Sequence, residues 1–302
     1  MSMLPPVHLH LGPARAGKAA MMRRRYLDLV ATLGPTKVIF LVPTGQRRTA
    51  TLQALLKDSG RTVLWQPQVW TFPRYAEELL RRLRTPARRL TPLQQRAFLE
   101  RAVAEVRKDG AFAYFTPIAD RSGFLDSVAD FIHQLKIHAV PPEVFLRTVR
   151  RSRPALQEMA AVYARYQKLL AAAGLYDDAG LFWQVKEALA AAWPSGIAPQ
   201  EVLVDGFQDF SPPQRDILLR LREAGARLTI TLPCDPARPK VFAWTMRTLE
   251  ALRATFGSAL VVHEPDPPPA RAAGTLARFE QCLWDDTATG QAASPPEAVQ
   301  FI

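Results

Sequence analysis

A loop of eight residues near the start of the chain has the spacing of a phosphate-binding loop. Its frame is GxxxxGK, in which glycines let backbone N–H groups point at phosphate oxygens and the lysine reaches the β- and γ-phosphates. The helix expected after it adds the positive end of its dipole. The candidate nucleotide-binding residues are Gly12, Pro13, Ala14, Arg15, Ala16, Gly17, Lys18 and Ala19, together with Asp205 farther along the chain.

Two side chains that an ATPase needs are missing. Ala19 stands where a Ser or Thr hydroxyl would bind Mg²⁺. In VLVDGFQDF (202–210), Asp205 ends an apolar run, as the acid that holds the metal does, but Gly206 replaces the Glu that activates water. Loss of a positioned general base costs about 10²–10⁴ in rate. We therefore predict no intact catalytic residue, and the losses count against ATP with Mg²⁺ as a ligand.

The elements around these motifs alternate between strand and helix, which is typical of a parallel α/β sheet. Between about 74 and 195 almost every segment instead has helical period. We predict one discontinuous domain (1–75 and 196–302) and a helical insertion (76–195). The expected strands are 7–11, 37–43, 61–65, 69–71, 201–207, 227–233 and 259–263, and the expected helices outside the insertion are 18–33, 47–58, 212–224 and 241–255.

Composition restricts the class of protein further. With 48% hydrophobic residues the chain is an ordinary globular protein, and it has neither a membrane-length apolar run nor a secretory signal. Cys234 and Cys282 are its two cysteines, too few for a disulfide framework or a four-cysteine metal site. We expect a cytoplasmic protein. The end of the chain, Phe301-Ile302, resembles the start of a further strand, which suggests a piece of a larger protein.

The net charge of +11 comes mostly from arginine, with 31 Arg against 8 Lys. A GC-rich genome would explain this bias, and so would a phosphate-binding surface, because the arginine fork matches phosphate oxygens. Clustering favours the surface, since like charges at such density repel unless a polyanion neutralises them. One cluster contains Arg81, Arg82, Arg84, Arg88 and Arg89, and the other Arg147, Arg150, Arg151 and Arg153.

Taken in order, the motifs resemble those of superfamily 1 helicases of the UvrD type. GPARAGKA is similar to the phosphate loop, LVPTGQRRTATLQALL to the next DNA-contacting segment, and TFPRYAEELLRRL to a TFHxxAxxxLR segment. VLVDGFQDF matches the strand that carries the metal-binding acid, and ITLPCD (230–235) matches the strand that follows it. The resemblance implies a P-loop NTPase (RecA-like) parallel sheet flanked by helices, with a large all-helical insertion.

The resemblance is stronger to one branch, the AddB subunits of the bacterial AddAB helicase–nuclease. That branch reads D-G-F-x-D-F where active helicases read D-E-x-Q-D, and this chain has the same pattern from Asp205 to Phe210. Two long stretches, GFLDSVADFIHQLKIHAVPPE (123–143) and VYARYQKLLAAAGLYDDAGL (162–181), also look like AddB. In that family this part is helicase-like and contributes to recognition of the Chi sequence, and a nuclease domain with an iron–sulfur cluster follows outside the present chain.

The resemblance also implies the partners and the DNA contacts. The expected partners are single-stranded or forked duplex DNA and an AddA-type helicase–nuclease subunit, with no membrane, in a bacterial cytoplasm at the nucleoid. The whole family is an ATP-dependent helicase–exonuclease, whereas this portion is expected to hydrolyse ATP poorly or not at all. The segments that touch single-stranded DNA in such helicases contain Pro43, Thr44, Gln46, Thr71, Phe72 and Arg74.

Three hypotheses about function stay open at this point. The first is a non-motor DNA-binding module acting in double-strand break repair and recombination. The second is an active DNA-stimulated ATPase, in which Gln208 or Asp209 replaces the lost Glu. The third is a scaffold that only holds its protein partner.

Overall fold

The computed structural model describes residues 4–14, 16–191, 193, 198–236 and 238–264, and its backbone forms two compact units. The first unit contains the described residues up to Val69, Gln200–Asp209 and the residues from Arg227 on. The second contains Trp70–Pro199 and Phe210–Ala226. This division differs from the predicted one because the helix after Phe210 belongs with the other helices of the second unit.

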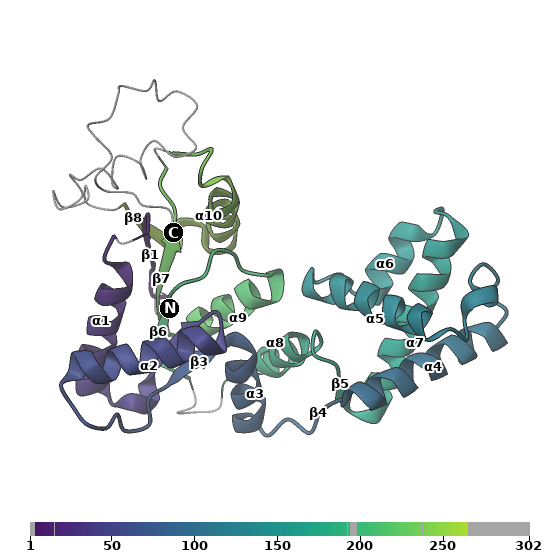
Figure 1. Ribbon diagram of the computed structural model, residues 1–302, viewed down its shortest axis with the longest axis horizontal. Helices are drawn as coiled ribbons and strands as arrows, with labels where there is room; N and C mark the ends of the chain where they lie inside the picture. The colour runs from purple at the N-terminus through teal and green to yellow at the C-terminus, as the bar shows by residue number, and fades with distance from the viewer. Residues whose placement is uncertain (1–3, 15, 192, 194–197, 237, 265–302) are drawn as a thin grey trace, which may run out of the picture. The chain divides into compact units, whose positions relative to one another are not determined.

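A six-stranded sheet is the frame on which the first unit is built, and its strand order is β3-β2-β6-β7-β1-β8 (Figure 1). The neighbours β1–β7, β1–β8, β2–β6 and β6–β7 are all parallel, so the predicted α/β class with a mostly parallel sheet is confirmed. The strands are β1 (Val7–Gly12), β2 (Val38–Val42), β3 (Val69–Thr71), β6 (Glu201–Val204), β7 (Arg227–Pro233) and β8 (Leu260–His263).

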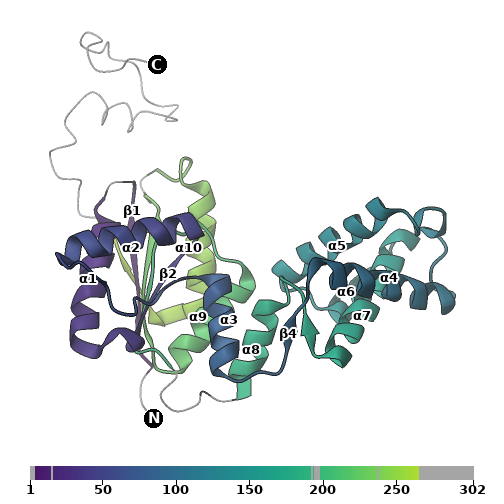
Figure 2. The same ribbon diagram turned by 60° about the horizontal axis from the view of Figure 1, so that its bottom comes forward.

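Helices cover both faces of this sheet, which is why the central strand β2 is apolar throughout. All five residues of β2 are buried. Met22 and Tyr26 of α1 and Leu55 of α2 pack with Phe40 on one face, while α10 lies against β7 and β8 on the other side from α1 (Figures 1 and 2). The helices are α1 (Lys18–Leu33), α2 (Gly45–Ser59) and α10 (Ala243–Phe256), with 3₁₀ turns η1 (Pro35–Lys37) and η3 (Gly257–Ala259).

Two strand predictions in this unit are corrected by the structure. Residues 61–65 form no strand, because Val63 and Trp65 are 66% and 77% exposed and no sheet face covers them. The apolar side chains in this segment match the sequence pattern of a buried strand, but in the structure they are exposed. The strand expected at 201–207 ends at Val204, where the backbone enters a turn at Gly206 with φ +85°.

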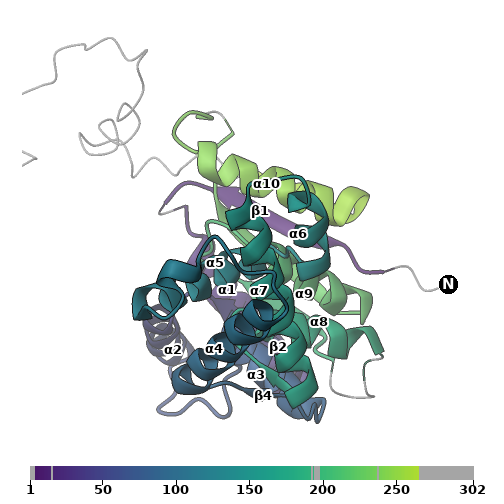
Figure 3. The ribbon, with the colours of Figure 1, turned by 90° about the vertical axis from the view of Figure 1, so that its right-hand side faces the viewer.

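The second unit is mainly helical. One hydrophobic core joins α4, α5 and α7 (Figure 3). Val128, Tyr163 and Tyr166 are fully buried in it. The unit is not all-helical as predicted, because β4 and β5 form a short parallel pair in which the Arg88 N–H donates to the Gly174 carbonyl at 3.0 Å. The elements are α3 (Phe72–Arg82), β4 (Arg88–Arg89), α4 (Pro92–Lys108), η2 (Thr116–Ile118), α5 (Ser122–Ile137), α6 (Pro142–Val149), α7 (Pro154–Ala173), β5 (Leu175–Tyr176), α8 (Leu181–Ala191) and α9 (Pro212–Glu223).

A buried ion pair joins two parts of this helical unit. Lys136, near the end of α5, is fully buried, and its ammonium donates to both oxygens of Asp177 at 2.9 and 2.8 Å. The Gly180 N–H donates to Asp177 Oδ1 at 2.8 Å, and the Lys136 ammonium lies 5.3 Å from the centre of the Tyr166 ring. Asp177 therefore connects α5 to the turn before α8.

None of the helices in the described part of the chain could span a membrane. Across the ranges given above, every helix is too short or too polar to cross a membrane.

Candidate functional site

The GxxxxGK segment lies between a strand and a helix, the setting that a phosphate loop requires. β1 ends at Gly12, and α1 begins at Lys18 directly after Gly17. Gly17 is the N-cap and has φ +79°, a left-handed conformation that favours glycine. Arg15 lies outside the described residues. The loop thus brings the N-terminus of α1 to the carboxyl end of the sheet.

The Lys18 side chain folds back over its own loop. Its Nζ donates to the Gly12 carbonyl at 2.5 Å and to the Pro13 carbonyl at 2.7 Å. Burial lowers the pKa of Lys18, and the nearby negative charge of Asp205 opposes that shift. The ammonium is therefore held at the loop and within electrostatic reach of Asp205.

Asp205 is buried directly beyond the end of β6, and protein groups already engage both of its oxygens. Thr231 Oγ1 on β7 donates to Oδ1 at 2.6 Å. Arg47 Nη2, from the first turn of α2, lies 3.5 Å from Oδ2. The Asp205 N–H donates to the Leu41 carbonyl at 3.0 Å, which fixes the backbone that carries the carboxylate.

Ala19 and Gly206 offer neither a metal-binding hydroxyl nor a carboxylate. Ala19 carries only a methyl group and lies in the first turn of α1. Gly206 has φ +85°, and a Cβ built there would lie 3.5 Å from Arg47 Nε and 3.5 Å from Pro43 Cδ. Arg47 of α2 therefore borders the position after Asp205, and Gly206 offers no carboxylate there.

The residues present do not fit a Mg²⁺ ion. A magnesium site in this kind of loop takes a hydroxyl from the residue after the lysine and a carboxylate that reaches the metal. Ala19 supplies no oxygen, and the oxygens of Asp205 face Thr231 and Arg47. Among the described residues, no group of three or more His, Cys, Asp or Glu side chains is placed to hold a metal ion.

The residues proposed to replace the lost Glu, Gln208 and Asp209, lie on an exposed turn. The Thr248 hydroxyl of α10 donates to the Gln208 carbonyl at 2.9 Å and holds this turn against α10. This hydrogen bond is accepted by the backbone of Gln208, so it does not fix the direction of the Gln208 side chain.

The predicted DNA contacts fall in two groups, one in each unit. Pro43, Thr44 and Gln46 connect β2 to α2 in the first unit, where Thr44 and Gln46 are exposed. Thr44 is the N-cap of α2, and its hydroxyl accepts from the Arg47 N–H at 3.1 Å. The end of this helix is therefore open to solvent and suited to a phosphate.

The second group lies at the junction of β3 and α3. Arg74 is exposed, but Thr71 is 8% and Phe72 1% exposed. The Phe72 ring packs edge-on against Phe210 with centroids 6.3 Å apart. A ring buried in this way cannot stack on a base, so we correct the expectation for Phe72 and assign it to the core.

Sequence reasoning missed Arg47 and Thr231, although both contact Asp205. The signal for Thr231 is the strand register, because Val204 pairs with Ile230 and the next residue on each strand is Asp205 or Thr231. Arg47 gave no such signal, since its approach to Asp205 depends on how α2 packs.

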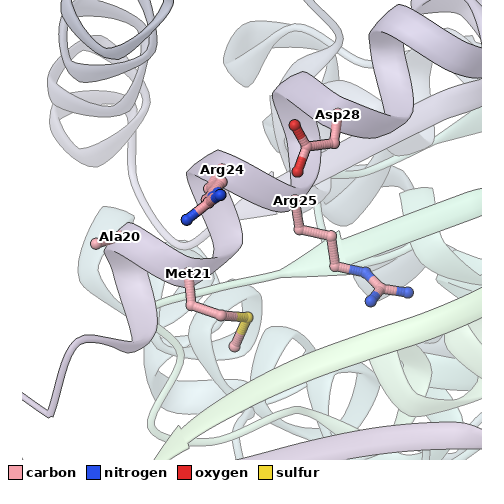
Figure 4. Close-up of a pocket in the computed structure, with 5 residues that line it drawn as sticks. All are labelled: Ala20, Met21, Arg24, Arg25 and Asp28. Atoms are coloured by element: carbon pink, nitrogen blue, oxygen red, sulfur yellow. The ribbon is translucent and has the colours of Figure 1, made fainter.

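A shallow hollow along α1 lies apart from these groups, and it is lined by Ala20, Met21, Arg24, Arg25 and Asp28 (Figure 4). All five of these described residues belong to α1. Arg25 extends toward the strands, and its Nη2 lies 3.8 Å from Oε2 of the buried Glu201. We assign no chemistry to this hollow.

Comparison with known proteins identifies the family. Residues 9–268 match the family described as ADDB, N-terminal. The chain belongs to this AddB N-terminal family. It is 27% identical over 298 residues to an AddB-type subunit of the ATP-dependent helicase/deoxyribonuclease of Moorella thermoacetica, covering 91% of this chain and 26% of that protein.

The corresponding subunits from two bacilli are also similar. The one from Bacillus cereus is 26% identical over 237 residues, covering 74% of this chain and 20% of that protein. The one from Bacillus anthracis is 28% identical over 210 residues, covering 66% and 18%. The chain therefore spans about a quarter or less of the curated AddB relatives that it matches.

Proposed function

We propose that this chain is the helicase-like, DNA-binding portion of an AddB-type subunit, with a P-loop NTPase (RecA-like) sheet that does not work as a motor. It would act beside an AddA-type subunit on single-stranded or forked DNA in double-strand break repair, with Chi recognition as one role. The family match and the names of its relatives, which join a helicase to a deoxyribonuclease, support this assignment.

One observation carries the non-motor part of the proposal. A strand ends at Gly12 and a helix begins at Lys18, as around a phosphate loop, yet Ala19 carries a methyl group and Gly206 is a left-handed glycine. Hydrolysis needs a water activated by a base and a leaving group stabilised by charge. Backbone N–H groups at the start of α1 and the cations Lys18 and Arg47 support binding, whereas neither Ala19 nor Gly206 carries a group that could act as a base.

A DNA-stimulated ATPase assay on the purified chain tests this. We expect turnover far below about 1 s⁻¹, the low end of ordinary enzymes. Turnover above that level, abolished by Lys18→Ala, would favour the active ATPase and contradict the proposal.

The DNA-binding part rests on exposed arginines. Arg147 lies in the last turn of α6, and Arg150, Arg151 and Arg153 lie between α6 and α7. All four are exposed, and no described residue forms an ion pair with any of them. Guanidinium groups without acidic partners are free to bind phosphate oxygens. Binding to an unstructured single strand should therefore weaken steeply with salt, and binding that is absent at low salt would favour a scaffold that only holds a protein partner.

A further inference from the structure

We infer that the phosphate loop takes a phosphate-bearing ligand without a divalent cation, and that the Arg47 guanidinium supplies the positive charge beside Asp205. The inference deepens the proposed nucleotide site and rests on it. Arg47 lies in the LVPTGQRRTATLQALL segment but is not one of the predicted site residues, and the inference assigns to it the role of an internal counter-ion that replaces the metal.

The first step is the state of the Asp205 carboxylate. The side chain is only 6% exposed, and one oxygen accepts from Thr231 Oγ1 at 2.6 Å. The other oxygen lies 3.5 Å from Arg47 Nη2. A buried carboxylate needs a cation or hydrogen-bond donors nearby, and this one has the Arg47 guanidinium and the Thr231 hydroxyl from the protein itself.

The second step is the space beside Asp205. Because Gly206 has no side chain, Arg47 Nε lies only 3.5 Å from the place where its Cβ would be. A glutamate at this position would begin in direct contact with the guanidinium group. Gly206 thus places no side chain beside Arg47, and the guanidinium group lies next to Asp205 without a second carboxylate from the following residue.

The third step is the balance of charge. Lys18 and Arg47 each bring one positive charge to the single negative charge of Asp205, so the site is already cationic. A divalent cation would meet repulsion from both and would find no hydroxyl at Ala19. The Arg47 side chain is 46% exposed, which leaves N–H donors open to a phosphate that enters from solvent.

Calorimetric titration with ATP tests the inference, in buffer with MgCl₂ and in buffer with excess EDTA. We expect the wild-type Kd to agree within about twofold between the buffers, a difference smaller than one ordinary hydrogen bond would make. Arg47→Ala should weaken binding by about tenfold or more in EDTA, and Arg47→Lys should recover part of it. The matched control is Arg61→Ala, an exposed arginine beyond the far end of α2 that should leave Kd unchanged.

A second variant tests replacement directly. Ala19→Ser combined with Arg47→Ala gives back a hydroxyl and frees Asp205, so its ATP affinity should become at least about tenfold higher with Mg²⁺ than with EDTA. Affinity of the wild type that disappears in EDTA, or a double variant without any response to Mg²⁺, overturns the inference. Thermal melting of each variant shows that it is folded before it is titrated.

DNA binding measured on the same samples separates this inference from the proposed function. Undetectable ATP binding in both buffers, with DNA binding intact, overturns the metal-free site and leaves the DNA-binding role standing. Unchanged ATP binding without any DNA binding overturns the DNA-binding role and leaves the site standing.

Discussion

The hydroxyl of Thr231 and the carboxylate of Asp205 form the most deeply placed polar contact of the candidate site. Thr231 is 1% exposed, and the oxygen that accepts its hydrogen bond at 2.6 Å is buried with it. Because water cannot replace the lost donor, a buried charged acceptor is costly to leave unsatisfied. The contact therefore stabilises the sheet as well as orienting the acid.

We predict that Thr231→Val lowers the free energy of unfolding by about 1.5–3 kcal/mol, the value of a hydrogen bond to a charged group. Urea unfolding measures the change. The same strand offers a matched control in Thr229, which is also 1% exposed and whose hydroxyl has no hydrogen-bond partner among the described residues. Thr229→Val should be neutral or stabilising, and equal losses in the two variants would contradict the role given to Thr231.

At this scale the sequence could identify the residues that act through local spacing. Lys18 and Gly17 follow from the loop frame, and Asp205 follows from its place at the end of an apolar strand. Arg47 could not be found in the same way, because its partner lies far along the chain and meets it only through the packing of α2. For Phe72, the motif could not distinguish a core position from a surface one.

Among the elements of the second unit, α5 and the turn before α8 depend on the buried Lys136–Asp177 pair. Burial lowers the pKa of Lys136, while its hydrogen bonds and charge contact with Asp177 oppose the shift. Removing one partner leaves the other charge buried and unpaired, which typically costs about 3–5 kcal/mol.

We therefore predict a loss of that size in Lys136→Met and in Asp177→Leu, and a much smaller loss in the double variant, because it buries no charge. Denaturant unfolding of the four proteins in the cycle gives the coupling energy. The control is Lys186→Met, which breaks an exposed pair with Asp216 at 2.6 Å and should cost less than about 1 kcal/mol. Independent, additive losses at Lys136 and Asp177 would refute the pairing.

The pairing of β1 with the edge strand β8 carries a cluster of histidines. His10 and His263 are paired in the strand register and stack with ring centroids 4.5 Å apart, and His8 Nδ1 lies 2.9 Å from His263 Nε2. Burial, then the neighbouring histidines and Arg25, lower the pKa of His10 to about 4. The pKa of His8 is lowered in the same way, although Glu201 partly opposes the shift.

These shifts predict how stability depends on pH. Between about 4 and the ordinary value of 6.5 the unfolded chain binds protons at His10 that the folded chain does not, so unfolding becomes easier as the pH falls through this window. The melting temperature of the first unit should drop from about pH 7 to about pH 5, and His10→Phe should reduce that drop. His133→Gln, at an exposed position of α5, is the control that should leave the pH dependence as it is.

At the scale of the whole molecule, the arginines in the described part of the chain separate into paired and unpaired groups, which the sequence alone could not distinguish. In the cluster from 81 to 89, Arg81 and Arg82 share Glu78, and Arg89 contacts Glu77 and Asp178. The expectation that this cluster needs a polyanion is therefore wrong for these arginines, since nearby acidic residues neutralise them. The density of arginines along the sequence does not show which acidic residues folding brings close to them.

The arrangement of strands and helices was easier to predict from the sequence than the pairing of charged residues. Alternation of apolar strands with amphipathic helices is enough to predict a parallel sheet, because each central strand must bury both faces. The strand predicted at 61–65 failed since apolar residues also occur in an exposed loop. The short pair β4–β5 could not be predicted, because two residues are too few to form a pattern.

The arginine cluster at the end of α6 and before α7 (Arg147, Arg150, Arg151 and Arg153) lacks acidic partners among the described residues. We therefore expect it to contribute to DNA binding. Arg147→Gln, Arg150→Gln and Arg151→Gln together should weaken DNA binding and lower the slope of log K against log salt by about 2–3, if each arginine neutralises one phosphate. A matched triple variant, Arg81→Gln, Arg89→Gln and Arg101→Gln, removes the same charge from arginines that already pair with acidic residues. It should change the slope by less than about 1. If both triple variants lower the slope equally, the chain attracts DNA by net charge alone, and the surface between α6 and α7 has no special part in binding.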